Sequence, residues 1–175
     1  MGRLGRKFEL RQRHRRELLE RLCGWSGEKL RAQPAEGGWN ALEVVDHLIR
    51  TEEAIMGAMV AGAAAPCRIP ATDRVKGALL TRMFLTPARV RVPAQVSFLL
   101  PRDVGTMEEL AARWDAVERE MEGRLALWES VPGKLGIFRH PVAGWMSASG
   151  ALSFLNAHIV HHGFQVDRIQ QSIER

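Results

Sequence analysis

The six histidines are the residues of this chain best suited to chemistry, and two of them share one face of a predicted helix. His158 and His162 are four positions apart, which places their side chains one helical turn apart, with Cβ atoms about 5–6 Å from each other. They lie in register with Leu155 and Ile169, on the apolar face that should turn inward. An unpaired buried nitrogen costs about 1–3 kcal/mol, so two inward imidazoles require hydrogen-bond partners or a metal ion.

A third histidine, His47, lies in register with Val44, Leu48 and Ile55 on an earlier predicted helix and should also face inward. Neutral imidazoles suit zinc, nickel, copper or iron, and three protein ligands leave coordination positions free for water or a substrate. An i, i+4 histidine pair is by itself a weak signal, because a hydrogen-bonded core histidine is more common than a metal ligand. The spacing alone leaves both interpretations open.

Three further polar residues are candidates for lining a substrate site next to these histidines. Gln165 continues the stripe of His158 and His162 by one turn, where it could orient a ligand or a substrate. His161 is rotated about 100° from His162, so it is interpreted as a helix-edge residue and a fallback ligand. His140 precedes the last helix in a loop and is interpreted either as a turn residue or as part of the pocket wall. No further catalytic group is predicted.

The acidic residues near His47 have simpler explanations than catalysis. Glu43 lies on the same face, but a capping box already accounts for it, which leaves general-base chemistry as the minor interpretation. Asp46, Glu52 and Glu53 are interpreted as solvated charges on the helix surface. No acidic residue is therefore predicted to be a ligand.

Four long segments with helical periodicity must position these side chains. The predicted helices run from Leu4 to Cys23, from Ala41 to about Gly62, from Thr106 to Ser130 and from Ser147 to about Ile173, with short helices expected over Ser26–Ala32 and Asp73–Leu85. Asn40 with Glu43 and Thr106 with Glu109 form capping boxes at two of the starts. Along the third long helix, the apolar residues from Leu110 to Trp128 recur every three or four positions and predict one buried stripe.

The predicted fold is all-α, a four-helix bundle forming a single domain over residues 1–175. Only Val90–Leu99 shows β alternation, and prolines bracket it, so no sheet is expected. The 43 residues between Gly62 and Thr106 are enough for a crossover along the bundle, between the second and third long helices. Those two helices would then run parallel.

Composition describes an ordinary folded domain and limits the classes of function. With 175 residues, 46% hydrophobic and 26% charged, the chain is neither disordered nor dependent on disulfides, and Cys23 and Cys67 are expected to be free thiols. No apolar run of about 18 residues exists, so no membrane span is expected. The basic start leads into Glu17 and Glu20 rather than an apolar stretch, which argues against a signal peptide and favours the cytoplasm.

The net charge of +5 is concentrated at the N-terminus. Residues 1–16 contain seven lysines and arginines and one acid, for a charge of +6, which leaves −1 for the remaining chain. A nucleic-acid-binding face would combine spread basic residues with aromatic stacking partners. The segment from Arg3 to Arg16 is therefore interpreted as a solvated helix face, and nucleic acid binding ranks last among the hypotheses.

Two parts of the chain, residues 37–48 and the stretch from 140 to 166, resemble the DinB-like superfamily. Residues 37–48, Gly-Gly-Trp-Asn-Ala-Leu-Glu-Val-Val-Asp-His-Leu, resemble its GGW(S/N)xxEVxxHL signature. Residues 140–147, His-Pro-Val-Ala-Gly-Trp-Met-Ser, resemble its entry to the last helix, and residues 158–166 resemble its HxxHHxxQ segment. Two motifs at a compatible separation are far more specific than either one alone.

The resemblance implies a four-helix bundle with a long crossover, one divalent metal ion, zinc or nickel, and a homodimer. The implied ligands are His47, His158 and His162. The implied activities on a small molecule are transfer or isomerisation with a low-molecular-weight thiol, or hydrolysis. Gly163 departs from the family, where arginine is frequent, and a mid-helix glycine costs about 1 kcal/mol relative to alanine. The alternative is a non-catalytic dimeric bundle that binds a ligand or acts as a stress-related scaffold.

Overall fold

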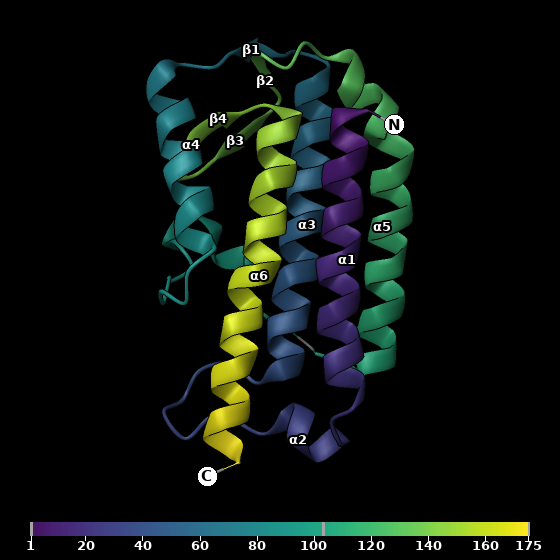
Figure 1. Cartoon of the computed structure of the whole chain (residues 1–175), viewed down its shortest axis with the longest axis vertical. Coiled ribbons are helices and arrows are strands. Elements are labelled where there is room, and N and C mark those ends of the chain that lie inside the picture. Colours follow the sequence, from purple (N-terminus) through teal and green to yellow (C-terminus); the bar gives the residue numbers. More distant parts are fainter. Residues whose placement is uncertain (1, 103, 175) are drawn as a thin grey trace.

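Four long helices lie side by side in the computed structural model, which describes residues 2–102 and 104–174 (Figure 1). They are α1 (Arg3–Cys23), α3 (Ala41–Ala63), α5 (Met107–Ser130) and α6 (Ala148–Ile173). Helix α1 packs against α5 and α6, and α3 packs against the same two helices. The described chain is mostly helical, as expected for an all-α protein.

Helices α3 and α5 run in the same direction, and α1 and α6 run in the opposite one (Figure 1). Between α3 and α5 the chain forms a short strand, α4 (Ala71–Phe84) and the 3-10 helix η1 (Ala94–Leu99). Helix α4 packs on α6, outside the four long helices. This intervening segment therefore returns the chain to the end of the molecule where α3 began, and η1 contacts α3.

Side-chain caps begin the helices where the sequence predicts them. The Asn40 side chain accepts the backbone N–H of Glu43 at 3.0 Å, and the Glu43 carboxylate accepts that of Asn40 at 2.8 Å. Thr106 and Glu109 form the same reciprocal pair at the start of α5. Ser26 caps the short helix α2 (Gly27–Arg31), and Ser147 caps α6. Both predicted capping boxes are confirmed.

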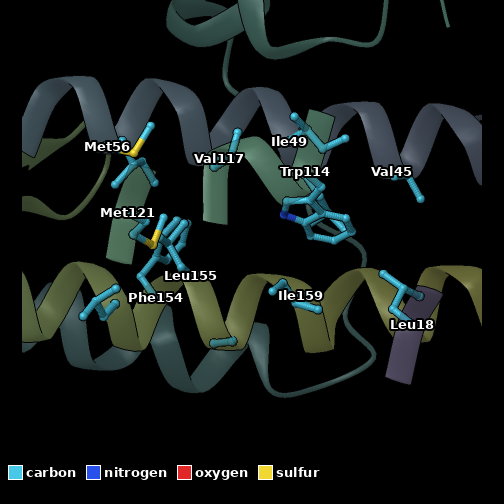
Figure 2. Close-up of a cluster of buried hydrophobic side chains, with 14 of the residues drawn as sticks. Leu18, Val45, Ile49, Met56, Trp114, Val117, Met121, Phe154, Leu155 and Ile159 are labelled. Atoms are coloured by element: carbon cyan, nitrogen blue, oxygen red, sulfur yellow. The ribbon is translucent and has the colours of Figure 1, made fainter. Parts of the chain in front are cut away.

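The apolar stripes of α3, α5 and α6 meet in a continuous core (Figure 2). Trp114 and Met121 of α5 are fully buried there, together with Ile49 of α3 and Leu155 of α6. The stripe predicted on α5 is confirmed, although its member Leu125 is only partly buried. Burial of these stripes determines which face each helix turns toward its neighbours.

Short strands close one end of the molecule, contrary to the expectation of no sheet. Cys67–Arg68 (β1) pairs antiparallel with Leu135–Gly136 (β2), and Phe138–His140 (β3) pairs antiparallel with Gly144–Met146 (β4). Strands of two or three residues are too short to show alternation in sequence, which is why the periodicity missed them. The segment Val90–Leu99 ends in η1 rather than forming a strand.

Gly62 allows the β2–β3 segment to cross the end of α3. A Cβ atom at position 62 would lie 1.9 Å from the backbone oxygen of Ile137, so any other residue requires the two segments to move apart. Ile137 itself is buried, and its N–H donates to the Met146 oxygen at 3.0 Å. This contact positions β3, and with it His140, against the helices.

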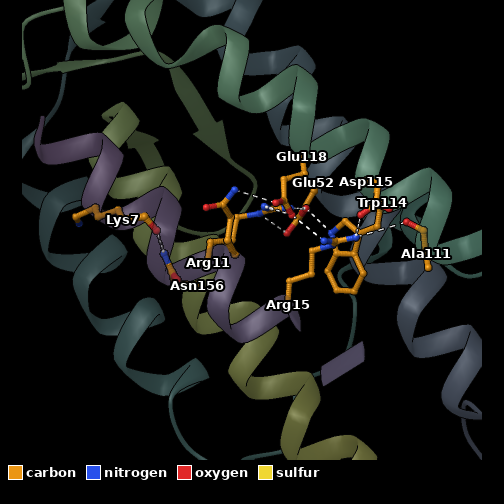
Figure 3. Close-up of polar contacts among 10 residues, drawn as sticks. Lys7, Arg11, Arg15, Glu52, Ala111, Trp114, Asp115, Glu118 and Asn156 are labelled. Atoms are coloured by element: carbon orange, nitrogen blue, oxygen red, sulfur yellow. Dashed lines mark hydrogen bonds and ion pairs between the residues drawn. The ribbon is translucent and has the colours of Figure 1, made fainter. Parts of the chain in front are cut away.

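Charged side chains of α1, α3 and α5 form a buried network between the helices (Figure 3). Arg11 and Glu52 are both fully buried and form a two-pronged ion pair, with 2.9 Å between Arg11 Nε and Glu52 Oε1. Trp114 Nε1–H donates to Glu52 at 2.7 Å, and Arg15 pairs with Glu118 at 2.9 Å. Sequence periodicity does not reveal such pairs, because a charged residue resembles a surface position until its partner is known.

This network corrects two interpretations made from the sequence. Glu52 and Asp46 are not solvated charges but buried ones, and Glu53 is paired with Arg113 at 2.5 Å. The basic N-terminal segment is not a purely solvated face either, because Arg11 and Arg15 are buried. Two of the seven basic residues of this segment are therefore unavailable to a nucleic acid.

Within the described residues, no helix combines the length and the hydropathy that a membrane span requires.

Candidate metal centre

The structure brings His47, His158 and His162 together in a buried cluster. His47 comes from the first two turns of α3, and the other two lie one turn apart in the middle of α6. One ligand nitrogen from each ring lies within 4.8 Å of those from the other two, and each residue is at most 5% exposed. The ring centroids of His158 and His162 are 4.6 Å apart, and His47 is 5.2 and 4.9 Å from them.

Hydrogen bonds to the outer nitrogens fix the orientation of two of these rings. Nδ1–H of His47 donates to the backbone oxygen of Leu99 at 2.8 Å, and Nδ1–H of His162 donates to Gln165 Oε1 at 2.8 Å. With the proton on Nδ1, the Nε2 lone pair of each ring is free to bind a metal. His158 differs, because its Nδ1 is buried without a hydrogen-bond partner among the described residues.

The inner nitrogens have the separation that a single ion requires. Nε2 of His158 and Nε2 of His162 are 3.1 Å apart. Two imidazole ligands on a tetrahedral zinc ion, each at 2.0–2.1 Å, lie about 3.3 Å from each other. The three-histidine set could therefore hold a metal ion with little rearrangement.

Burial keeps the cluster uncharged at neutral pH, as metal ligation requires. Desolvation holds the pKa of His158 well below its usual 6.5, and the neighbouring His162 and His47 lower it further. The pKa of His162 is also well below 6.5, mainly through burial and then through His47. Burial lowers the pKa of His47 as well, while the Leu99 hydrogen bond and the charge of Asp46 oppose the shift.

Asp46 anchors the segment that carries the His47 acceptor, a role that the sequence analysis missed. Its carboxylate accepts the backbone N–H of Arg102 at 3.1 Å and side-chain donors of Arg113 at 2.8 Å and Arg50 at 2.6 Å. Arg102 follows Leu99 by three residues, so Asp46 holds the end of this segment against α3. The available signal was that Asp46 is adjacent in the sequence to a candidate ligand. A carboxylate so close to an inward residue is itself partly buried and requires a cationic partner.

A cavity of about 970 Å³ opens onto the three histidines. Its wall is largely aromatic and aliphatic, and it includes Trp39, Phe84, Phe138, Phe154, Ile55, Val92, Phe98 and Leu99. The Trp39 ring lies 4.7 Å from that of His47 and stacks on His162 at 6.2 Å. The volume is within the usual range for small-molecule sites, and the predicted metal ligands lie in its wall.

The three predicted substrate-lining residues all border this cavity. Gln165 has the orienting position expected of it, next to His162. His161 is buried, not a helix-edge residue: its ring packs 4.8 Å from Phe84, and its Nδ1 has no partner among the described residues. It does not belong to the group of nitrogens that converge on one point.

His140 combines the two roles considered for it. It ends β3 rather than lying in a loop, and its Nδ1 accepts the backbone N–H groups of Val142 and Ala143 at 3.1 and 3.2 Å. Its ring lies 4.8 Å from Phe154 in the cavity wall. Burial lowers the pKa of His140 to about 4, so at neutral pH its Nδ1 is an acceptor and its Nε2 carries the proton.

Glu43 and the two cysteines lie outside the site. The Glu43 carboxylate accepts the backbone N–H of Asn40, which confirms the capping explanation, and the residue does not line the cavity. Cys67 lies half-buried in β1 and Cys23 is exposed; both are free thiols, and neither borders the cavity. Nucleophilic catalysis by cysteine therefore has no support in the described structure.

Comparisons with known proteins agree with the motifs. No curated protein and no solved structure gave a significant match to the chain. A family profile described as the DinB superfamily matches residues 11–166, a span that contains His47, His158, His162 and every long helix except the outer turns of α1 and α6. This match covers most of the sequence, and the chain belongs to the DinB superfamily.

Proposed function

We propose that this protein is a metal-dependent enzyme that acts on a small molecule, with His47, His158 and His162 holding one divalent ion, zinc or nickel. The observation that carries the proposal is the convergence of one nitrogen from each ring within 4.8 Å, in rings of which two, His47 and His162, have Nδ1 occupied by a hydrogen bond and Nε2 left for the ion. Membership of the DinB superfamily supports the same assignment.

The surrounding residues prepare the site for chemistry on a bound molecule. Leu99 and Gln165 accept the Nδ1–H of their histidines, while Trp39 packs against His47 and Phe84 packs against His158. The three histidines line the cavity, where a substrate has room beside them. A divalent ion at this position supplies Lewis acidity, either to acidify water for hydrolysis or to stabilise a thiol cosubstrate as its thiolate.

Metal content tests the proposal directly. Protein expressed without a histidine tag, in medium supplemented with zinc or nickel, should contain close to one equivalent of metal by elemental mass spectrometry. His47→Ala, His158→Ala and His162→Ala should each lose most of it. His161→Ala is the matched control, because it removes a neighbouring buried imidazole outside the convergent set. Less than about 0.2 equivalents in the wild type, or metal loss in the control variant alone, would refute the ligand assignment.

The broader fold and assembly follow as part of the proposal. We infer that the four long helices form the four-helix bundle of the family, with residues 64–106 as its crossover, and that the protein works as a homodimer in the cytoplasm. The exposed apolar residues Val75, Leu79 and Leu85 in and just after α4 provide a surface for a second copy. Light scattering should give twice the chain mass of 19.6 kDa, and a monomer would contradict the dimer without affecting the metal assignment.

A further inference from the structure

Positive charge surrounds the cavity that leads to the histidines. Four arginines line it, Arg89, Arg91, Arg139 and Arg168, and Glu36 is the one acidic residue that does so within the described chain. Glu36 is already paired with Arg89 at 2.9 Å. The other three arginines have no ion-pair partner among the residues that the structure describes. A cavity lined with uncompensated cations concentrates anions.

Arg168 is the arginine best placed to contact a molecule bound at the histidines. It lies on α6, six residues after His162, which corresponds to about 9 Å along the helix axis. It shares a stripe of α6 with His161 and Gln165, both of which border the cavity.

The guanidinium of Arg168 is held in place but retains unused donors. Nη1 donates to the backbone oxygen of Pro87 at 3.2 Å, and the side chain is half-buried between α6 and the segment after α4. A guanidinium has five N–H donors in a planar fork that matches a carboxylate. One bond to Pro87 therefore fixes the group without exhausting its capacity to bind an anion.

The apolar wall of the cavity determines what the rest of the ligand can be. Phe84, Phe154 and Trp39 surround the imidazoles, and Phe98 and Val92 continue the apolar lining. We propose that the cavity binds an organic carboxylate, with its apolar body against this wall and its carboxylate on Arg168. This inference deepens the proposed function and rests on it only in taking the cavity as the substrate site of the three-histidine centre.

Matched ligands that differ in one group test the charge selectivity. The probes are 4-phenylbutyrate, 4-phenylbutylamine and 4-phenyl-1-butanol, titrated calorimetrically into the zinc-loaded wild type. The acid should bind at least tenfold more tightly than the amine or the alcohol. Equal affinity for acid and amine would overturn the proposal, because the arginines that line the cavity would then have no effect on which ligand binds.

Variants of Arg168 locate the selectivity. Arg168→Gln should raise the dissociation constant of the acid at least tenfold and leave that of the alcohol within twofold. Arg168→Lys retains the charge without the planar fork and should keep part of the preference for the acid. It provides a second test if the glutamine variant folds poorly. Arg74→Gln removes an exposed arginine of α4 outside the cavity and should change neither value. Unchanged acid binding in both Arg168 variants would overturn the assignment.

A metal-free arm separates this proposal from the metal assignment. In the double variant His158→Ala, His162→Ala, the acid should still bind more tightly than the amine, and Arg168→Gln should still abolish the preference. If the carboxylate instead binds the metal, the preference for the acid should disappear in the double histidine variant and persist in Arg168→Gln. That result would overturn the present inference. If the protein binds no metal, the proposed function fails, but the effect of Arg168 on the acid remains measurable.

Discussion

Replacing Gln165 by leucine tests whether the outer hydrogen bond of His162 sets the metal affinity. The Gln165 amide oxygen accepts the Nδ1–H of His162 at 2.8 Å, and it is the acceptor that keeps the proton on this nitrogen. Leucine has a similar volume and no acceptor. In the Gln165→Leu variant the imidazole loses its orientation and can move its proton to Nε2, the nitrogen that should face the ion.

The size of the effect follows from the buried position of the ring. His162 is 5% exposed, so water does not readily replace the lost acceptor, and an unsatisfied buried N–H costs about 1–3 kcal/mol. Outer partners of metal-bound histidines are worth about 10–100-fold in metal affinity. We therefore expect Gln165→Leu to raise the zinc dissociation constant about 10–100-fold, which corresponds to about 1.4–2.7 kcal/mol.

Competition with a chromophoric zinc chelator of known affinity measures this change. Gln171→Leu is the matched control, because Gln171 also borders the cavity but has no hydrogen bond to a ligand histidine in the described structure. Gln165→Glu should bind zinc at least as tightly as the wild type, since a carboxylate is a stronger acceptor. A change of less than threefold in Gln165→Leu, or an equal change in Gln171→Leu, would show that this hydrogen bond does not control the site.

Three further predictions follow from the buried charges and from His140. Asp46→Asn should weaken zinc binding severalfold by loosening the segment that carries the His47 acceptor, whereas Glu53→Gln, which also disturbs Arg113, should leave the zinc affinity unchanged in the same competition assay. Arg11→Met should lower the free energy of unfolding, measured in urea, by about 3–5 kcal/mol because it leaves Glu52 buried without its ion-pair partner. The double variant Arg11→Met, Glu52→Met should recover most of this loss. Failure to recover would mean that packing, not charge, is responsible. The metal-free wild type should lose stability as the pH falls below 6.5, because unfolded His140 takes up a proton there while the folded side chain, with a pKa of about 4, does not. The contribution of His140 to this loss is about 2 kcal/mol at pH 5, in addition to that of the other buried histidines, and His140→Asn, which keeps an acceptor for Val142 and Ala143, should remove it; equal pH profiles of the two proteins in urea titrations would contradict the assignment.

The helices and the inward histidines were predictable because both follow from the helical period. His47, His158 and His162 lie in register with apolar residues, and whatever buries those residues must also turn the imidazoles inward. Capping residues such as Asn40 and Thr106 set the helix starts locally, so no tertiary information was needed. The family motifs added the pairing of the two helices that periodicity alone does not provide.

The buried ion pairs and the outer hydrogen bonds were not predictable in the same way. Arg11 and Glu52 are 41 residues apart, and neither differs in local pattern from a surface charge. The acceptor for His47 is a backbone oxygen, that of Leu99, and any residue can provide one. Such features depend on how separate segments meet, which is information that one sequence does not display.

Two charged residues of α3 fix the rotation of this helix about its axis, and with it the direction of His47. Viewed along the helix axis, Asp46 lies about 100° to one side of His47 and binds Arg113 of α5. Glu52 lies about 140° to the other side and binds Arg11 of α1. A rotation of α3 by one residue would separate both buried carboxylates from their arginines, at several kcal/mol for each pair. The same rotation would turn His47 away from α6. Apolar contacts alone tolerate small shifts of register, whereas two ion pairs on opposite flanks do not, so the network on the far side of α3 holds the imidazole where the other two rings converge.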